Sequence, residues 1–203
     1  DNEIELPELF IEMKEKLQNF PVVGYIGSLR ELEGVDLTAK AVSILKEQGV
    51  DVNFFVLSSE AGQDELRDYC KSLGIANQSY IEGPVPHEQV APFYDLIDVF
   101  VVSRPDTKVT RLVTPLKPFE AMLSGRAVVM SNLPALAEII EDGETGRLYP
   151  AGDAQALSET INELLQNEPK RLKLGDNAKS WVTENRTWDS VTEKMSFIYE
   201  GLL

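Results

Sequence analysis

Short runs of apolar residues recur along the chain and alternate with segments whose apolar positions are spaced as on one face of a helix. The runs lack the polar alternation of half-exposed strands, which is typical of strands buried on both faces of a parallel sheet. They predict strands at 22–27, 53–57, 78–82, 98–103, 127–131 and 145–149. The other segments predict helices at 37–48, 64–73, 87–97, 115–124, 134–141, 154–166, 169–184 and 188–202.

This alternation of strand and helix predicts an α/β fold, a Rossmann-like three-layer sandwich with a mostly parallel sheet. Residues 1–20 form an acidic segment with a late helical pattern, and they lead into one domain over residues 21–203. Ligands of such folds bind beyond the carboxyl ends of the strands. The loops to consider are therefore 27–34, 58–62, 83–88 and 103–114.

Composition excludes several classes of function. The 203 residues suit one large α/β domain, and the formal net charge of −15 disfavours a nucleic-acid partner, which would need a basic face. No run of about 18 apolar residues occurs, and no signal-peptide pattern opens the sequence. The single cysteine, Cys70, excludes an internal disulfide, lies on an apolar helical stripe and fits a reducing compartment. We therefore expect a cytoplasmic protein with Cys70 in its core.

The loop after the first predicted strand is a candidate for ligand contact. Gly27 and Gly34 would let the backbone approach a ligand closely. The loop has neither the three-glycine pattern of dinucleotide-binding folds nor the Gly-Lys-Ser/Thr ending of a phosphate-binding loop. A plain strand-to-helix turn explains the two glycines equally well.

The strongest chemical signal lies in residues 114–126. Pro115 suits the first turn of a helix, and Gly125 suits the residue after its end. Lys117 and Glu120 would share one face of that helix because they are three residues apart. A helix start that carries a cation and a carboxylate can hold a phosphate and a sugar hydroxyl together. The segment therefore predicts a sugar-nucleotide site.

Positive charge is concentrated between residues 101 and 126 of an otherwise acidic chain. This window holds five cations against two carboxylates, namely Arg104, Lys108, Arg111, Lys117 and Arg126 against Asp106 and Glu120. Such a local excess should attract an anion, although solvated loop charges would give the same composition.

Other chemistry-bearing residues are less informative. His87 is the sole histidine and follows Pro86 at a predicted helix start, which favours a capping or surface role over acid–base catalysis. Glu138 fits a site residue and a solvated helix face equally well. No His, Cys or Asp residues have the spacing of a metal site, so we expect no metal.

The order of the motifs resembles that of a known family. The glycine loop is followed by Pro84-Val85-Pro86-His87-Glu88-Gln89-Val90 and by Asp98-Val99-Phe100-Val101-Val102-Ser103-Arg104. After them come Thr114 to Met122, Gly125 to Val129, Pro134 to Glu138, and Asp142-Gly143 to Thr145-Gly146. Over residues 20–200 the chain resembles the C-terminal, donor-binding domain of glycosyltransferase family 4, the retaining group 1 enzymes with the GT-B fold.

The resemblance implies roles for individual residues. Glu120 matches the glutamate that binds the nucleotide ribose, and the loop at Gly27 and Ser28 would approach the diphosphate. Residues 114–116 would offer backbone N–H groups to the phosphates, through Thr114 and Leu116, while Ser58 and Val85 would border the nucleobase. Phosphate charge would be balanced by basic side chains, for which the candidates are Arg30, Arg104, Arg111 and Lys117. The implied substrate is a UDP- or GDP-sugar, and the reaction would need no metal and no further cofactor.

The chain departs from the family pattern in its charged residues. Ser28 and Glu33 replace an arginine and a lysine that usually face the diphosphate. Leu112 replaces a glutamate that lies eight residues before the ribose-binding one, and Arg111 lies near the place of a subgroup's glutamate. Such a carboxylate engages the donor sugar. Arg30, Arg104 or Lys117 would have to substitute for the missing cations.

The leading hypothesis is the donor-binding half of a glycosyltransferase of envelope or exopolysaccharide synthesis. The acceptor-binding domain would precede residue 1, and through it the protein would attach to the inner face of the membrane and reach a glycan or lipid-linked acceptor. This half alone should be inactive. The departures at Ser28, Glu33 and Leu112 keep open a non-catalytic nucleotide-sugar-binding or scaffolding homologue. A nucleotide-sugar epimerase is a third reading, disfavoured because neither Gly-x-Gly-x-x-Gly nor Tyr-x-x-x-Lys occurs.

Overall fold

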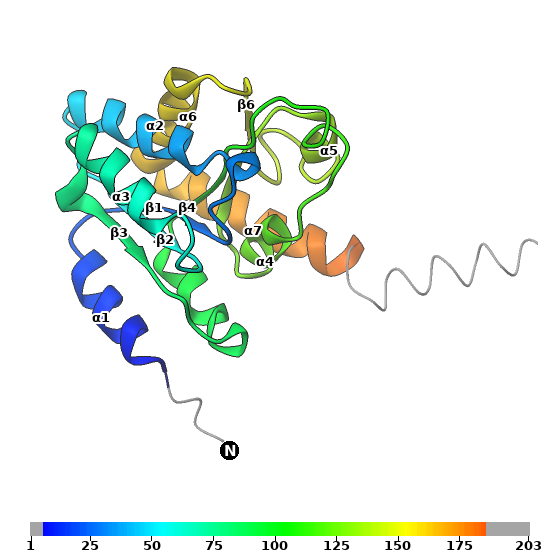
Figure 1. The fold of residues 1–203 in the computed structure, drawn as a ribbon. Helices are drawn as coiled ribbons and strands as arrows, with labels where there is room; N and C mark the ends of the chain where they lie inside the picture. The colour runs from blue at the N-terminus through cyan, green and yellow to red at the C-terminus, as the bar shows by residue number, and fades with distance from the viewer. Residues whose placement is uncertain (1–5, 186–203) are drawn as a thin grey trace, which may run out of the picture.

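Six parallel strands form the centre of the computed structural model, which describes residues 6–185 (Figure 1). The strands are β1 (Val22–Ile26), β2 (Asn53–Leu57), β3 (Ser79–Glu82), β4 (Val99–Val102), β5 (Ala127–Ser131) and β6 (Arg147–Tyr149). Their spatial order is β3-β2-β1-β4-β5-β6, so the direction of winding reverses between β1 and β4. Ligands of open parallel sheets bind outside such a reversal, at the carboxyl ends of the strands.

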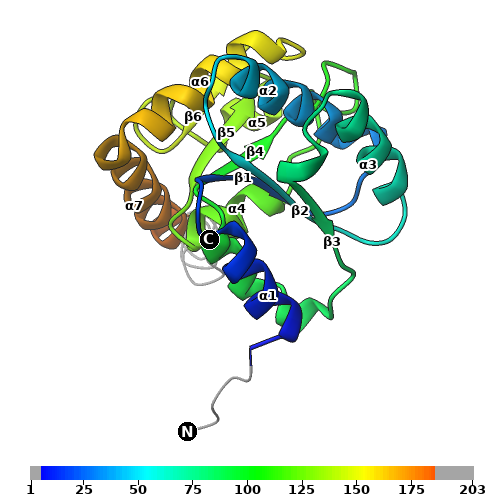
Figure 2. The ribbon, with the colours of Figure 1, turned by 90° about the vertical axis from the view of Figure 1, so that its left-hand side faces the viewer.

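Helices cover both faces of this sheet (Figure 2). One layer contains α2 (Val35–Glu47), α3 (Gln63–Ser72) and α6 (Ala154–Gln166), and the other contains α1 (Glu8–Leu17), α4 (Lys117–Leu123) and α7 (Glu168–Asn185). The shorter elements are α5 (Pro134–Ala137) and the 3-10 helices η1 (Glu31–Glu33), η2 (Ala76–Gln78), η3 (His87–Gln89) and η4 (Ala91–Leu96). The predicted three-layer α/β sandwich is therefore confirmed, with a sheet that is wholly parallel.

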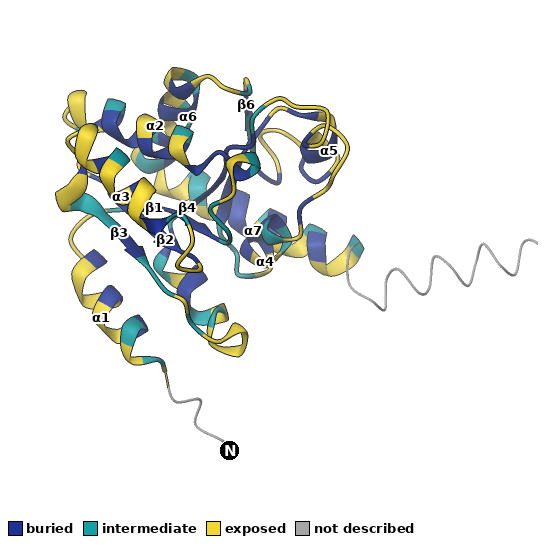
Figure 3. Cartoon of the chain, viewed as in Figure 1, coloured by how far each residue is buried: buried dark blue, intermediate teal, exposed yellow. Residues whose placement is uncertain are grey.

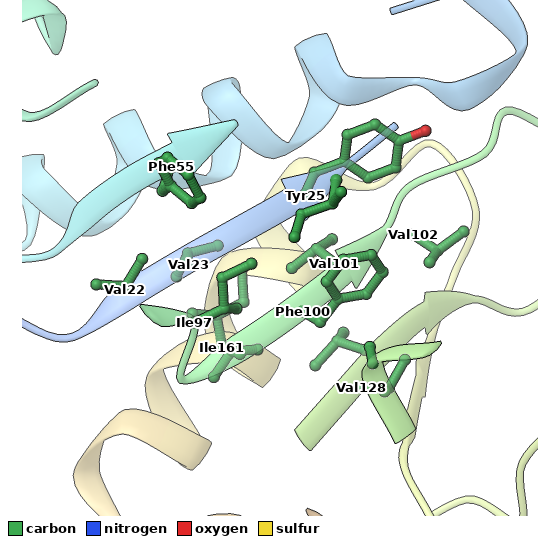
Figure 4. Packing of buried hydrophobic residues seen from close by; sticks show 14 of the residues in the cluster. Val22, Val23, Tyr25, Phe55, Ile97, Phe100, Val101, Val102, Val128 and Ile161 are labelled. Carbon is green, nitrogen blue, oxygen red and sulfur yellow. The ribbon is translucent and has the colours of Figure 1, made fainter. Parts of the chain in front are cut away.

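The sheet lies at the centre of the hydrophobic core. Every residue of β1, β2, β4 and β5 is buried, which explains why these strands are uninterrupted apolar runs in the sequence. Exposed positions gather on the outer faces of the helices (Figure 3). Phe100 of β4 is 0% exposed, and its ring lies beside that of Tyr25 (Figure 4), with 6.0 Å between the ring centroids. The ring centroid of Tyr94 lies 5.6 Å from that of Phe100. Cys70 is also buried, as its apolar helical stripe predicts.

Most predicted elements are present. All six strands occur, and α2, α3, α6 and α7 differ from their predicted bounds by at most two residues. The late helical pattern in residues 1–20 corresponds to α1. The predicted helix at 188–202 lies outside the described residues.

Three helix predictions are wrong in extent or type. Residues 87–97 form η3 and η4 instead of one α-helix, because Pro92 has no N–H to donate and sits in the first turn of η4. Helix α4 begins at Lys117, so that Pro118, and not Pro115, occupies its first turn. The helix predicted at 134–141 ends at Ala137, and the N–H of Glu141 donates instead to the side chain of Thr145 at 2.8 Å.

The central position of Phe100 predicts a large loss of stability on truncation. Phe100→Ala should lower the free energy of unfolding by about 3–5 kcal/mol, because it leaves a cavity beneath two tyrosine rings. Urea denaturation followed by circular dichroism measures this loss. The matched control is Phe20→Ala, whose side chain is 46% exposed and should lose far less. Equal losses in the two variants would contradict the central role of Phe100.

Candidate functional site

A cleft of about 300 Å³ opens at the carboxyl ends of β1 and β2. The loop after β3 and the helices η3 and η4 form one wall, with Val85, His87 and Tyr94 among the lining residues. Gly27 follows β1, and Lys117 and Glu120 of α4 form the opposite side. The cleft therefore lies where the order of a doubly wound sheet predicts a ligand.

Glu120 is held at the wall of the cleft by a tyrosine. The Tyr94 hydroxyl donates to Glu120 Oε2 at 2.6 Å. Tyr94 is only 2% exposed, and this burial, together with the Glu120 carboxylate, raises the pKa of the phenol. The phenol therefore stays a hydrogen-bond donor, and the carboxylate keeps further lone pairs for a ligand.

Lys117 crosses the floor of the cleft above Gly27. Its Nζ donates to the Tyr25 hydroxyl at 3.1 Å, lies 3.4 Å from Glu33 Oε1 and sits 5.5 Å from the centroid of the Tyr25 ring. A Cβ atom at Gly27, whose φ is +152°, would lie 2.3 Å from Lys117 Cε. A side chain at this position would displace the end of the lysine from its place.

Behind Lys117 lies a buried ion pair. Arg104 donates from Nε and Nη2 to the two carboxylate oxygens of Glu33, both at 3.1 Å, and the two residues are 5% and 1% exposed. Burial alone would raise the pKa of Glu33, but the hydrogen bonds from Arg104 and the charge of Lys117 outweigh it and hold the pKa below its ordinary value. Glu33 is therefore an anion in the folded protein.

The loop after β1 is clamped to the end of β4. Gly34 has a φ of +64°, and a Cβ atom there would lie 2.1 Å from the Ser103 carbonyl oxygen. The Ser103 hydroxyl donates to the Gly34 carbonyl at 2.6 Å and lies 2.8 Å from the Thr38 hydroxyl. These contacts fix the two loops that carry Glu33 and Arg104.

The structure brings some of the predicted residues together and leaves others apart. Gly27, Lys117 and Glu120 line the cleft, as do Ser58 and Val85, the residues expected at the nucleobase. Ser28 adjoins it, and its carbonyl accepts from the Tyr25 hydroxyl at 3.2 Å. The other residues lie outside this cleft: Thr114 and Leu116 are exposed before α4, Glu138 is exposed, and Arg30 lines a separate hollow beside α2 and α3.

The three arginines among the five cations counted between residues 101 and 126 form ion pairs with carboxylates in the structure. Arg104 pairs with Glu33, Arg111 with Asp106 at 3.1 Å, and Arg126 with Asp95 at 3.6 Å. Glu33 and Asp95 come from outside the counted window, because the fold joins segments that are distant in the sequence. Lys117 is the cation of this set that lines the cleft.

Three residues at the site were not predicted as functional. Tyr25 and Tyr94 lie within apolar segments, where an aromatic residue signals core packing, and no local pattern shows that their hydroxyls reach α4. The sequence identifies Glu33 only as a residue that stands in place of a lysine, and it does not predict that Glu33 pairs with Arg104. His87, expected at the surface, is exposed and lines the cleft.

Metal binding and membrane insertion find no support in the described residues. Among residues 6–185, no group of three or more His, Cys, Asp and Glu side chains is placed to hold a metal ion. Within the same residues, every helix is too short or too polar to cross a bilayer.

The fold and the cleft define a doubly wound α/β domain with a cleft at its switch point. Comparison with known proteins gives the family: residues 8–181 match the model of the glycosyl transferases group 1, and the chain belongs to this family. D-inositol 3-phosphate glycosyltransferase of Corynebacterium diphtheriae is 27% identical over 184 residues, 88% of this chain and 42% of that protein.

Solved structures show the same fold. The C-terminal domain of a group 1 glycosyltransferase, LpcC of Francisella tularensis, aligns with a TM-score of 0.71 and 22% identity over 87% of this chain and 93% of that one. Anabaena HepE in complex with UDP aligns with a TM-score of 0.79 and 20% identity over 97% of this chain and 54% of that one. The chain spans about half the length of the curated relatives it matches. It therefore has the fold of one half of a GT-B glycosyltransferase.

The buried pair predicts a specific acid sensitivity. Because the folded pKa of Glu33 lies below its ordinary value of 4.5, its contribution to stability is complete above that pH and is lost as the pH falls through the folded pKa. The free energy of unfolding, from urea titrations at a series of pH values, should therefore fall below about pH 4.5. The control is Glu33→Met/Arg104→Met, in which apolar side chains replace the pair and this part of the loss should disappear. An identical acid profile in both proteins would show that folding does not lower the pKa of Glu33.

Proposed function

We propose that this chain is the donor-binding half of a retaining glycosyltransferase, which transfers a sugar from a nucleotide-sugar to a glycan or lipid-linked acceptor. The observation that carries the proposal is the Glu120 carboxylate, which Tyr94 fixes at the wall of the cleft. A carboxylate accepts several hydrogen bonds, so a carboxylate held by one phenol can still accept from the two hydroxyls of a ribose.

Lys117, which lies on the same helix as Glu120, suits a diphosphate. An ammonium group has three donors, of which Tyr25 and Glu33 engage two in Lys117, and the third is free to meet a phosphate oxygen. The side chain of Lys117 is 27% exposed, so a ligand can reach it. The apolar lining at Leu57 and Val85 suits the face of a nucleobase. The complexes of HepE with UDP and with UDP-glucose support a nucleotide-sugar as the donor.

Membership of the family supports a proposal about the wider setting. We propose that the full protein pairs this half with an acceptor-binding domain, acts in envelope or exopolysaccharide synthesis, and works in the cytoplasm or at the inner face of the membrane. In the full protein this cleft would form one side of an active site that lies between the two domains. Residues 6–185 alone would therefore bind the donor without transferring its sugar. UDP- and GDP-sugars are the donor classes that we expect.

A second candidate is a non-catalytic nucleotide-sugar-binding or scaffolding homologue. The buried pair favours this candidate, since Arg104 is already bound to Glu33 and is not available to a phosphate. Leu112 also favours it, because it has no carboxylate at a position where the family resemblance implies one that engages the donor sugar. The two candidates differ in one measurement on the full-length protein. Release of nucleoside diphosphate from a nucleotide-sugar in the presence of acceptor indicates a transferase, whereas binding without release indicates the homologue.

The donor site is tested by calorimetry with UDP, GDP and ADP on the isolated chain. Wild type should bind at least one of them weakly, and Glu120→Ala should weaken binding of the matching nucleoside about tenfold to a hundredfold. The reason is that a charged hydrogen bond is worth about 1.5–3 kcal/mol. The control is Glu138→Ala, which removes an exposed carboxylate outside the cleft and should not change binding. No heat and no thermal shift in wild type at millimolar ligand would refute the site, and unfolding of Glu120→Ala would make Glu120 structural.

Lys117 should act on the phosphates alone. Lys117→Met keeps a similar length and removes the charge, so affinity for the diphosphate should fall much more than affinity for the bare nucleoside. Comparing the two dissociation constants by calorimetry isolates the phosphate contribution. Equal losses for both ligands would show that Lys117 supports the fold or the base pocket.

A further inference from the structure

The ammonium group of Lys117 already has an internal anion as its partner. Glu33 Oε1 lies 3.4 Å from Lys117 Nζ, and the same oxygen accepts from Arg104 Nη2 at 3.1 Å. Glu33 is 1% exposed, whereas the side chain of Lys117 is 27% exposed. A ligand in the cleft can therefore reach Lys117, but it cannot reach the carboxylate behind it.

The same contacts hold Lys117 over the backbone of the glycine loop. A Cβ atom at Gly27 would lie 2.3 Å from Lys117 Cε and 2.6 Å from Nζ, so the end of the lysine occupies the space above that residue. The Tyr25 hydroxyl accepts from Nζ at 3.1 Å and supports this position from the other side. A phosphate that approaches Gly27 must therefore draw Lys117 out of its place.

We infer that Glu33 is a positioning residue that holds Lys117 across Gly27 and competes with the phosphates of the ligand for its ammonium group. The inference rests on the proposed donor site and adds a determinant of its affinity. Glu33, Arg104 and Lys117 together carry one net positive charge, so the carboxylate offsets half of the positive charge available to a dianionic ligand. The nucleoside part contacts Glu120 instead, and its binding does not depend on Glu33.

The decisive experiment compares Glu33→Gln with wild type, using calorimetry. The ligands are the nucleoside diphosphate that wild type binds best, among UDP, GDP and ADP, and the matching nucleoside. Removing one negative charge several ångströms from the phosphates should tighten diphosphate binding on the order of tenfold. Binding of the nucleoside should not change. The neutral amide keeps one acceptor oxygen for Arg104, whereas its NH2 group cannot accept the second hydrogen bond.

Glu31→Gln is the matched control. It removes the same charge from the same 3-10 helix, but Glu31 is exposed and lines the separate hollow beside α2 and α3. It should leave both affinities unchanged. An unchanged diphosphate affinity in Glu33→Gln, or an equal gain in Glu31→Gln, would overturn the inference and leave the donor site intact. No binding of any diphosphate by wild type would instead refute the proposed function.

A measurement on the wild type keeps the inference testable if Glu33→Gln does not fold, since it leaves Arg104 buried without its counter-charge. Nuclear magnetic resonance can follow the ¹⁵Nζ signal of Lys117, assigned from its absence in Lys117→Met, together with the carboxyl carbon of Glu33. The diphosphate should shift both signals because the ion pair opens, whereas the nucleoside should shift neither. A bound diphosphate that leaves both signals in place would overturn the inference.

Discussion

The buried ion pair between Glu33 and Arg104 is the constraint on which the cleft depends. It joins η1, which follows β1, to the loop after β4, at the point where the strand order reverses. Arg104 also donates to the Val113 carbonyl at 3.1 Å, so the same side chain fixes the position of the segment that leads to α4. Removing Glu33 alone would leave Arg104 without a counter-charge in the protein interior, and removing Arg104 alone would leave Glu33 with Lys117 as its remaining cation. The pair thereby holds together three chain segments that border the site.

The polar site is built on an aromatic support. Phe100 contacts the rings of both Tyr25 and Tyr94, whose hydroxyls reach Lys117 and Glu120 respectively. Two side chains of one short helix are therefore held by two tyrosines from different elements, and both tyrosines rest on the same core residue. Close packing restricts the rotamers of these rings, so the positions of the lysine and the carboxylate follow from the hydrophobic core.

The strongly acidic composition shapes what such a site can do. A chain with a net charge of −15 repels an anionic ligand at long range, and salt screens that repulsion beyond about 10 Å. Attraction to phosphate must therefore come from short-range contacts in the cleft. The described structure supplies one cation there, Lys117, because the fold pairs Arg104, Arg111 and Arg126 with carboxylates. For this reason we expect affinity to be sensitive to the single carboxylate behind that lysine.

The sequence by itself determined the architecture, since continuous apolar runs separated by amphipathic segments are compatible with few folds other than a doubly wound sheet. It also placed Lys117 and Glu120 together, because residues three apart share a helix face whatever the tertiary context. Only the tertiary structure decided which charges remain available. Arg104 and its partner Glu33 are 71 residues apart, and Lys117 and Tyr25 are 92 apart. Helix and strand propensities act over a few neighbouring residues, whereas ion pairs and hydroxyl contacts between strand ends depend on how the sheet is wound.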